Sequence, residues 1–131
     1  MNPIHVTSEI GRLKTVMLHR PGLEIENLTP KWLEQLLFDD IPWLKKAQYE
    51  HDQLAKVFRQ AGVKVVYLSD LVAKALDQSV TIKTAFIDQF IQEAHITSET
   101  LAELVKSYLL SFTSTKAMVE KTMGGILKAE L

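Results

Sequence analysis

Glycine and proline are distributed unevenly along this chain of 131 residues. All four prolines lie in the first third, and neither residue type occurs between Gly62 and Gly124. Because glycine and proline are the main interrupters of helices and strands, the first half is predicted to be rich in turns and mixed in structure. The second half is predicted to be mostly helical.

The composition is that of an ordinary folded protein, with 47% hydrophobic and 24% charged residues. A formal net charge of −1 argues against a basic nucleic-acid-binding protein and against a polybasic membrane-surface protein. No apolar run approaches the roughly 20 residues that span a bilayer. The first five residues do not resemble a signal peptide. We therefore expect a cytoplasmic protein with neither nucleic acid nor membrane as a partner.

The absence of cysteine restricts the chemistry most. It excludes a disulfide framework, a thiolate metal site, an iron–sulfur cluster and a cysteine nucleophile within this chain. The four histidines are not spaced as metal ligands, since no HxH or HExxH pattern occurs. No metal and no cofactor is predicted.

The residue pattern of the first half predicts a parallel βαβ unit. Residues 13–18 and 63–68 read as strands, the second of them apolar enough to be covered on both faces. Between them, residues 43–61 read as a helix that ends at Gly62, where a left-handed residue is expected. Its predicted core-facing positions follow steps of three and four: Leu44, Ala47, His51, Leu54, Phe58 and Ala61. A further short strand is predicted at residues 4–8.

The segment between the first strand and the long helix is predicted to turn at Pro21-Gly22 and then to form a short helix. Thr29 suits the N-cap of this helix and Pro30 its first position, with Leu28 and Leu33 placed for a hydrophobic staple. Residues 38–42 are predicted to form a loop. Trp32 and Trp43 flank it and are expected to anchor it by packing.

The second half predicts four helices. The first covers residues 71–76 and is capped by Ser69 or Asp70. The others begin at Ser79, near Thr97, and near Thr113 or Ser114. Their predicted apolar faces are Ile82, Phe86, Phe90 and Ile91 or Ala94; Leu101, Leu104, Tyr108 and Phe112; and Met118, Val119 and Thr122.

Two features could carry chemistry, and each has a simpler structural interpretation. His51 interrupts an apolar helix face, which fits a catalytic group or a core histidine whose ring nitrogens find backbone or carboxylate partners. Asp39 and Asp40 fit acid–base work, or a solvated loop in which Asp40 caps the long helix. We favour the structural interpretation of both. Gly124-Gly125 lacks the context of a phosphate loop. The residues alone thus define no complete catalytic constellation.

Several motifs, in order along essentially the whole chain, resemble the start of bacterial arginine deiminases of the guanidine-modifying superfamily. The most specific is LLFDD at residues 36–40. The others are residues 4–13 (IHVTSEIGRL), 19–22 (HRPG), 28–30 (LTP), 34–40 (EQLLFDD), 50–52 (EHD), 65–71 (VVYLSDL) and 123–126 (MGGI).

The resemblance implies a fold and an activity. The fold class is α/β: residues 1–72 would form part of the first ββαβ-like blade of an α/β propeller, with a substrate-closing loop, and residues 73–131 a helical bundle insertion. The activity is hydrolysis of L-arginine to L-citrulline and ammonia through a cysteine thiolate. Leu37 matches the family's substrate contact, with Leu36, Phe38, Asp39 and Asp40 as residues of the loop that closes over arginine.

The family's catalytic elements are missing from this chain. They are an NxxFTRDP-type segment, an EGGD-type segment, an HxD-type pair and a C-terminal cysteine. We therefore expect an N-terminal fragment of an arginine deiminase that is inactive alone and self-associates through the strand edge and apolar surface it leaves open. The alternative is a short non-enzymatic interaction module that reuses this region.

Overall fold

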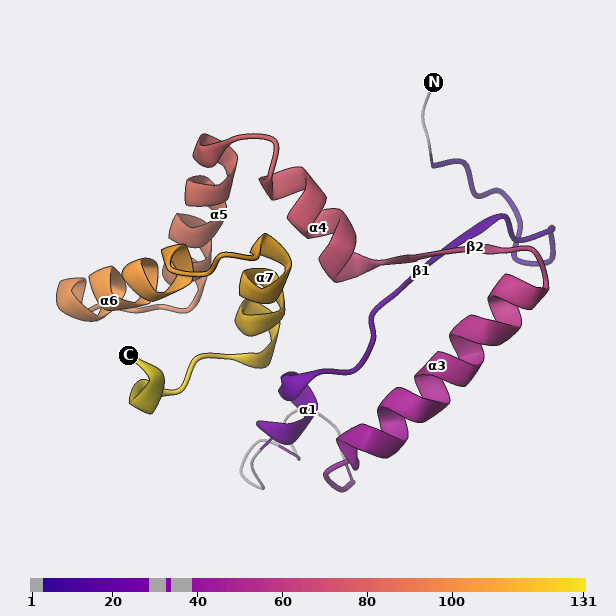
Figure 1. The fold of residues 1–131 in the computed structure, drawn as a ribbon, viewed down its shortest axis with the longest axis horizontal. Coiled ribbons are helices and arrows are strands. Elements are labelled where there is room, and N and C mark those ends of the chain that lie inside the picture. The colour runs from indigo at the N-terminus through magenta and orange to yellow at the C-terminus, as the bar shows by residue number, and fades with distance from the viewer. Residues whose placement is uncertain (1–3, 29–32, 34–38) are drawn as a thin grey trace.

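The structure is a computed structural model that describes residues 4–28, 33 and 39–131 (Figure 1). It is an α/β chain, mostly helical, with a small parallel sheet. The elements in chain order are β1 (Thr15–Leu18), α1 (Leu23–Glu26), α3 (Leu44–Gln60), β2 (Lys64–Tyr67), α4 (Leu68–Leu76), α5 (Val80–Glu93), α6 (Glu99–Leu110), α7 (Thr115–Gly124) and the 3-10 helix η1 (Lys128–Glu130).

The first half contains the predicted βαβ unit. β1 and β2 pair in parallel, with Val16 opposite Val65 and Leu18 opposite Tyr67. The helix α3 connects the two strands and packs against β2. Gly62 follows α3 with φ 75°, a conformation that glycine adopts without strain because it has no Cβ. The unit and the helix end are thereby confirmed.

Two predictions about strands are wrong. Residues 4–8 form no strand; instead the Ser8 hydroxyl accepts hydrogen bonds from the backbone N–H groups of Ile10 and Gly11 and closes a turn. The strand β2 is not covered on both faces, since Lys64 is exposed and Val65 to Tyr67 are only half-buried. Among the described elements, α3 packs against β2, and the strand nevertheless stays partly open to solvent.

The buried face of α3 agrees with the prediction at Leu44, Ala47, His51 and Phe58, and differs from it towards the end of the helix. Ala55 is fully buried, whereas Leu54 is 48% exposed and Ala61 is exposed as well. Leu44 is buried and His51 largely so, as predicted. The small side chain of Ala55 lets the helix backbone approach its neighbours closely, which an alternation of apolar residues does not reveal.

The loop before α3 also differs from the prediction. The N-cap of α3 is Trp43, which makes no side-chain capping bond, and the Asp40 carboxylate accepts from the backbone N–H of Ile41 instead. Trp43 is 70% exposed, so it does not anchor the loop. Residues 39–42 are irregular, as predicted. The predicted short helix from Thr29, its staple at Leu33 and the role of Trp32 depend on residues 29–32, outside the described residues.

The second half folds around one apolar core formed by α4 to α7. Three predicted helix starts are closed by serine side chains: Ser79, Ser98 and Ser114 accept from the N–H groups of Ile82, Leu101 and Ala117. The fully buried large side chains are Ile87, Leu109, Met118 and Val119. The prediction of a helical second half is confirmed, as are the buried positions Met118 and Val119.

Three details of that half are corrected. The helix α4 begins at Leu68, directly after β2, so Ser69 and Asp70 lie in its first turn and cap nothing. The α6 helix is capped by Ser98, one residue after Thr97. Finally, Ile82 and Leu104 are each 46% exposed, whereas Ile87 on α5 and Val105 and Leu109 on α6 are buried.

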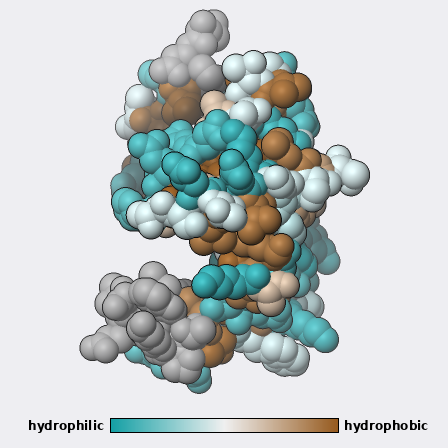
Figure 2. Space-filling model, turned by 90° about the vertical axis from the view of Figure 1, so that its left-hand side faces the viewer, coloured by the Kyte–Doolittle hydropathy of each residue, from teal (hydrophilic) through white to brown (hydrophobic). Residues whose placement is uncertain are grey.

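The two halves lie at opposite ends of an elongated molecule, and in the part of the chain that the structure describes they meet at α4 and at α1 (Figure 1). The helix α4 continues from β2 into the bundle, and α1 packs against both α3 and α7. The proposed boundary between residues 72 and 73 lies within α4, and the division into two domains stays a prediction. Seen from the helical end, hydrophilic residues surround a central hydrophobic band (Figure 2). No helix in residues 4–28, 33 and 39–131 is long and apolar enough to cross a membrane.

Candidate functional site

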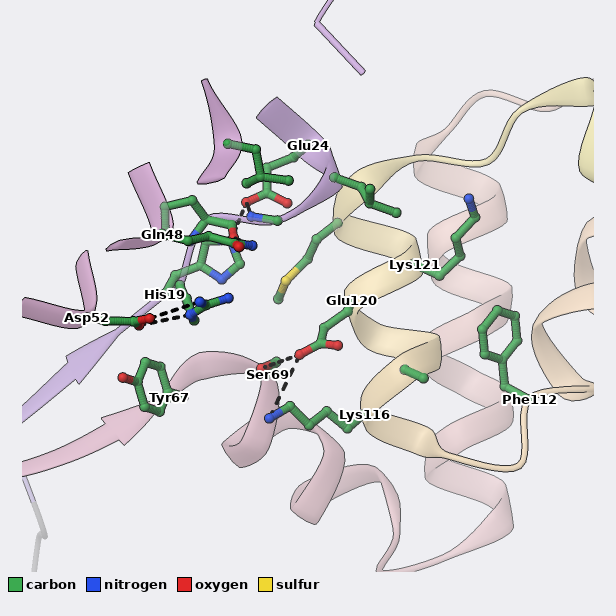
Figure 3. Close-up of a pocket in the computed structure, with 17 residues that line it drawn as sticks. His19, Glu24, Gln48, Asp52, Tyr67, Ser69, Phe112, Lys116, Glu120 and Lys121 are labelled. Carbon is green, nitrogen blue, oxygen red and sulfur yellow. Dashed lines mark hydrogen bonds and ion pairs between the residues drawn. The ribbon is translucent and has the colours of Figure 1, made fainter. Parts of the chain in front are cut away.

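A cavity of about 630 Å³ lies where the end of β1 meets α1, α3, α4 and α7 (Figure 3). Its wall therefore combines residues from both halves of the chain. The polar lining residues are His19, Arg20, Glu24, Gln48, Asp52, Tyr67, Ser69, Lys116, Glu120 and Lys121, and the apolar ones include Leu23, Leu44, Phe112 and Met123.

At one side of the cavity, Glu24 folds back onto the turn that precedes its own helix. Its Oε1 accepts a hydrogen bond of 2.7 Å from the backbone N–H of Gly22 and lies 2.8 Å from Nε2 of His19. Burial raises the pKa of this carboxyl, but the backbone N–H groups of Gly22 and Glu24 and the His19 ring together outweigh burial and lower it. The Glu24 carboxylate therefore already has hydrogen-bond partners within the chain, and it stabilises the Pro21-Gly22 turn.

Arg20 and Asp52 form the second polar pair of the cavity wall. The guanidinium donates from Nε and Nη2 to the two carboxylate oxygens, each at 2.9 Å. The hydrogen bonds from Arg20 are the main reason that the pKa of Asp52 is lowered, and they raise the pKa of Arg20 in turn. The pair joins the end of β1 to the middle of α3.

On the opposite side, α4 and α7 are joined by a polar group of four residues. The hydroxyl of Ser69 donates to Oε1 of Glu120 at 3.3 Å, and Nζ of Lys116 lies 2.6 Å from Asp70 and 3.9 Å from Glu120. The hydrogen bond with Asp70 is the main cause of the raised pKa of Lys116. Lys121 pairs with Glu130 at 2.6 Å, away from this group.

Most of the polar lining is thus already paired within the chain. Among the described residues, no histidine hydrogen-bonds a serine or threonine hydroxyl, and no cluster of histidine and acidic side chains could hold a metal ion. Arrangements of a base with a hydroxyl nucleophile need such a contact. The cavity can bind or position a group, but its residues do not assemble a covalent mechanism.

Of the residues singled out from sequence, those that the structure describes do not line this cavity. Asp39 and Asp40 are exposed and do not line it, while Leu36, Leu37 and Phe38 lie outside the described residues. His51 faces the interior with a side chain that is 11% exposed. Its two ring nitrogens are buried without a hydrogen bond, and Nδ1 lies 3.7 Å from Oδ1 of Asp52. The expected carboxylate is present, but not as a hydrogen-bond partner.

Sequence reasoning missed the polar pairs of the cavity. Arg20 belongs to the HRPG motif, yet its partner is 32 residues away on α3. Lys116 and Glu120 lie four residues apart on α7, a spacing that indicates a common helix face and nothing about Ser69 on α4. The only available signal was the concentration of charged residues after the first strand.

The fold and the cavity define a class: an α/β chain in which a parallel βαβ unit is joined to a helical bundle, with a polar cavity at the joint. Comparison with known families is specific. The family model described as arginine deiminase matches residues 34–131, which is 98 of the 131 residues. The chain belongs to the arginine deiminase family.

Individual relatives agree with this assignment. The chain is 56% identical over 128 residues to the arginine deiminase of Clostridium perfringens, covering 98% of this chain and 31% of the relative. It is 52% identical over 130 residues to that of Streptococcus uberis, covering 99% of the chain and 32% of the relative. It is 50% identical over 129 residues to that of Streptococcus equi subsp. zooepidemicus, covering 98% and 31%. The chain thus spans about a third of the length of these relatives.

Proposed function

We propose that this chain forms part of an arginine deiminase, which hydrolyses L-arginine to L-citrulline and ammonia. The observation that carries the proposal is the match of residues 34–131 to the arginine deiminase family model. The identity of 50–56% with proteins of that name, over nearly the whole chain, supports it.

The reaction requires a nucleophile that this chain does not contain. In the proposed mechanism a cysteine thiolate attacks the guanidinium carbon of arginine and forms a C–S bond, and ammonia leaves. Water then attacks the same carbon, the C–S bond breaks, and citrulline and the thiolate are released. The 131 residues include no cysteine, so the chain alone is proposed to be inactive.

The chain's own contribution would be to bind the substrate. Leu37 is proposed to contact arginine, and Leu36, Phe38, Asp39 and Asp40 to belong to the segment that closes over it. An apolar segment that covers the substrate excludes water from a charged and unreactive carbon. Asp39 and Asp40 are exposed at the end of this segment, which leaves them free of the core.

We further propose that the βαβ unit is part of the first blade of an α/β propeller and that α4 to α7 form a helical insertion in a cytoplasmic enzyme. The open sheet supports the first point. Leu13 and Met17 are four residues apart and therefore lie on the same side of the extended chain. Their side chains are 45% and 57% exposed. The same surface leads us to propose self-association of the isolated chain, which sedimentation velocity would detect as concentration-dependent dimers; a monomer at all concentrations would contradict it.

The function is tested by steady-state citrulline formation from the complete reading frame that encodes this chain. Leu37→Ala is expected to raise KM for arginine by about tenfold, because a lost apolar contact of this size is worth roughly 1.4 kcal/mol. Leu110→Ala is the control, since that side chain is 47% exposed on α6. An unchanged KM in Leu37→Ala would reject its role as a contact. A complete reading frame that yields no citrulline would favour the alternative, an interaction module.

A further inference from the structure

The helix α3 carries a second apolar stripe beside its buried face. Trp43 is 70% exposed, Leu54 48% and Val57 59%. The residues that α3 buries, Leu44 and Ala55, lie about 90° round the helix from these side chains. Steps of four and three residues connect the six positions that we call the α3 stripe, five of them apolar: Trp43, Ala47, Glu50, Leu54, Val57 and Ala61.

The spacing of the α3 stripe fits another helix. Alternating steps of four and three form the narrow seam between two helices that pack knobs into holes, whereas a helix that covers a globular core has a wider apolar face. The helix α3 lies along one edge of the molecule (Figure 1). Tryptophan is among the side chains that most often anchor protein interfaces. The exposed stripe therefore fits a helix that the described part of this chain does not supply.

The α3 stripe complements itself when a second copy of the helix runs in the opposite direction. The midpoint of the stripe is level with Asp52, and a two-fold axis there pairs its two ends. Trp43 then faces Ala61 of the second copy. Val57 likewise faces Ala47. Each large side chain thus meets a small one, which is how facing layers fill the space between two helices.

The middle of the stripe favours the antiparallel direction over the parallel one. In the antiparallel pair, Glu50 faces Leu54 of the second copy, and the side-chain amide of Gln53 is its polar neighbour across the seam. In a parallel pair, each Glu50 would face the other Glu50, and like charges in contact repel. Within one chain, Glu50 lies 3.2 Å from Nζ of Lys46, which balances its charge at the margin of the seam.

We propose that the α3 stripe is a two-fold interface between two copies of this protein, formed by antiparallel α3 helices. The surface is separate from the open sheet face around Leu13 and Met17 described above. The stripe is about 27 Å long, so the interface is small. A dissociation constant on the order of micromolar is expected for an interface of this size. The proposal goes beyond arginine hydrolysis and does not depend on it.

Cysteine cross-linking tests the pairing directly, because the 131 residues contain no cysteine. The double variant Ala47→Cys/Val57→Cys places thiols that face each other across the two-fold axis, so oxidation should join two chains. Within one chain the two thiols lie about 15 Å apart along the helix, too far for a disulfide bond. The matched control is Lys45→Cys/Arg59→Cys, which has the same symmetry about Asp52 but lies on the other side of α3.

We expect the double variant to form covalent dimers at least about tenfold faster than the control and than either single variant, because facing thiols react at a raised effective concentration. Peptide mass spectrometry should show the bond between residues 47 and 57. Equally fast dimers from Ala47→Cys alone would indicate parallel helices and would overturn the antiparallel pairing. Cross-linking of the double variant no faster than that of the control would overturn the interface.

Sedimentation velocity on the complete reading frame separates a second copy from the other occupant, the remaining part of the same polypeptide. Val57→Lys places a charge in the stripe, and Val80→Lys places the same charge on α5, where Val80 is 81% exposed. Val57→Lys should weaken self-association at least about tenfold and leave the Tm of the dilute monomer within about 2 °C. Val80→Lys should change neither.

Two results of the sedimentation experiment would overturn the proposal. One is an unmodified protein that stays monomeric at all concentrations. The other is a lower Tm in Val57→Lys with unchanged self-association, which would show that the stripe is buried within one polypeptide. Neither measurement uses arginine, so a failure here leaves the proposed function intact, and a complete protein without citrulline formation leaves the interface intact.

Discussion

Arg20, just after β1, donates two parallel hydrogen bonds of 2.9 Å to the two carboxylate oxygens of Asp52 on α3. This geometry uses the planar fork of the guanidinium, which a lysine ammonium cannot reproduce. The two side chains are 44% and 45% exposed, so solvent weakens the pair. Its main effect is to hold the segment that follows β1 against α3, where both residues line the cavity.

The pair predicts non-additive losses of thermal stability. Arg20→Lys and Asp52→Asn should each lower Tm modestly, and the double variant should lose no more than the larger single loss, because either change already removes the fork. The control is Lys46→Gln, which breaks the exposed pair between Lys46 and Glu50 on α3 and should change stability by less than about 0.5 kcal/mol. Tm is measured by calorimetry. If the Tm loss of the double variant equals the sum of the two single losses, the two groups do not act together.

Acid should destabilise the chain through three carboxylates. The pKa of Asp52 is lowered chiefly by Arg20 and that of Glu130 chiefly by Lys121, and the pKa of Glu24 is lowered by backbone N–H groups and His19 despite its burial. A carboxyl whose pKa is lowered in the folded state stabilises the chain at pH values above its ordinary pKa. That ordinary pKa is 3.8 for Asp52 and 4.5 for the two glutamates. That stability is lost as the pH falls through the folded-state values.

The acid prediction is checked by measuring Tm between about pH 7 and about pH 2.5 at constant ionic strength, a range that includes the ordinary pKa values of both residue types. Tm should fall on acidification below about pH 4.5, and Glu130→Gln should make that fall shallower. A Tm that rises below pH 4.5, or the same slope in Glu130→Gln, would be inconsistent with the assigned pairs.

The core of the bundle predicts a sharp contrast between two adjacent leucines. Leu109 is fully buried, and Leu110 is 47% exposed. Leu109→Ala should destabilise the chain by about 2–5 kcal/mol, because it removes buried methyl groups and leaves a cavity. Leu110→Ala should change the free energy of unfolding by less than about 1 kcal/mol. Denaturant unfolding measures both, and equal losses would place the core on the wrong face of α6.

The start of α6 gives a second contrast. The Ser98 hydroxyl accepts from the backbone N–H of Leu101, so Ser98→Ala should cost about 1 kcal/mol. Thr97→Ala should cost less than about 0.5 kcal/mol, because Thr97 lies outside the helix and caps nothing. Free energies of unfolding measured in urea separate the two. A larger loss in Thr97→Ala would restore the cap position expected from the sequence.

The elements that were predicted correctly are those set by local residue patterns. A glycine at a left-handed position ended α3 at Gly62, and serine marked the starts of α5 and α7. The parallel pairing of the two strands was expected because the connection between them is long enough to contain the crossover helix that a parallel pair needs. In each case a few neighbouring residues are enough to determine the structure.

The features that were missed depend on packing between distant segments. Periodicity placed Leu54 and Leu104 on buried faces, but Ala55 and Val105 are buried instead, since the closest approach of neighbours selects among adjacent apolar positions. The sequence excluded a phosphate loop at Gly124-Gly125 but gave Gly124 no packing role, and only the position of α1 shows that Gly124 is a contact. The helix α1 itself is too short to have a sequence signal. Of the candidate site, the motifs indicated the family but not the cavity, and the substrate segment stays a prediction.

The most direct test of the proposed function follows the guanidinium nitrogen atoms. The complete reading frame is supplied with arginine labelled with ¹⁵N at both terminal guanidinium nitrogens, and the products are analysed by mass spectrometry. Hydrolysis through attack on the guanidinium carbon predicts one labelled ammonia for each citrulline that keeps one label, and no product from the 131-residue chain alone. Labelled citrulline from the isolated chain, or none from the complete protein, would contradict the proposal that this chain is the cysteine-free part of an arginine deiminase.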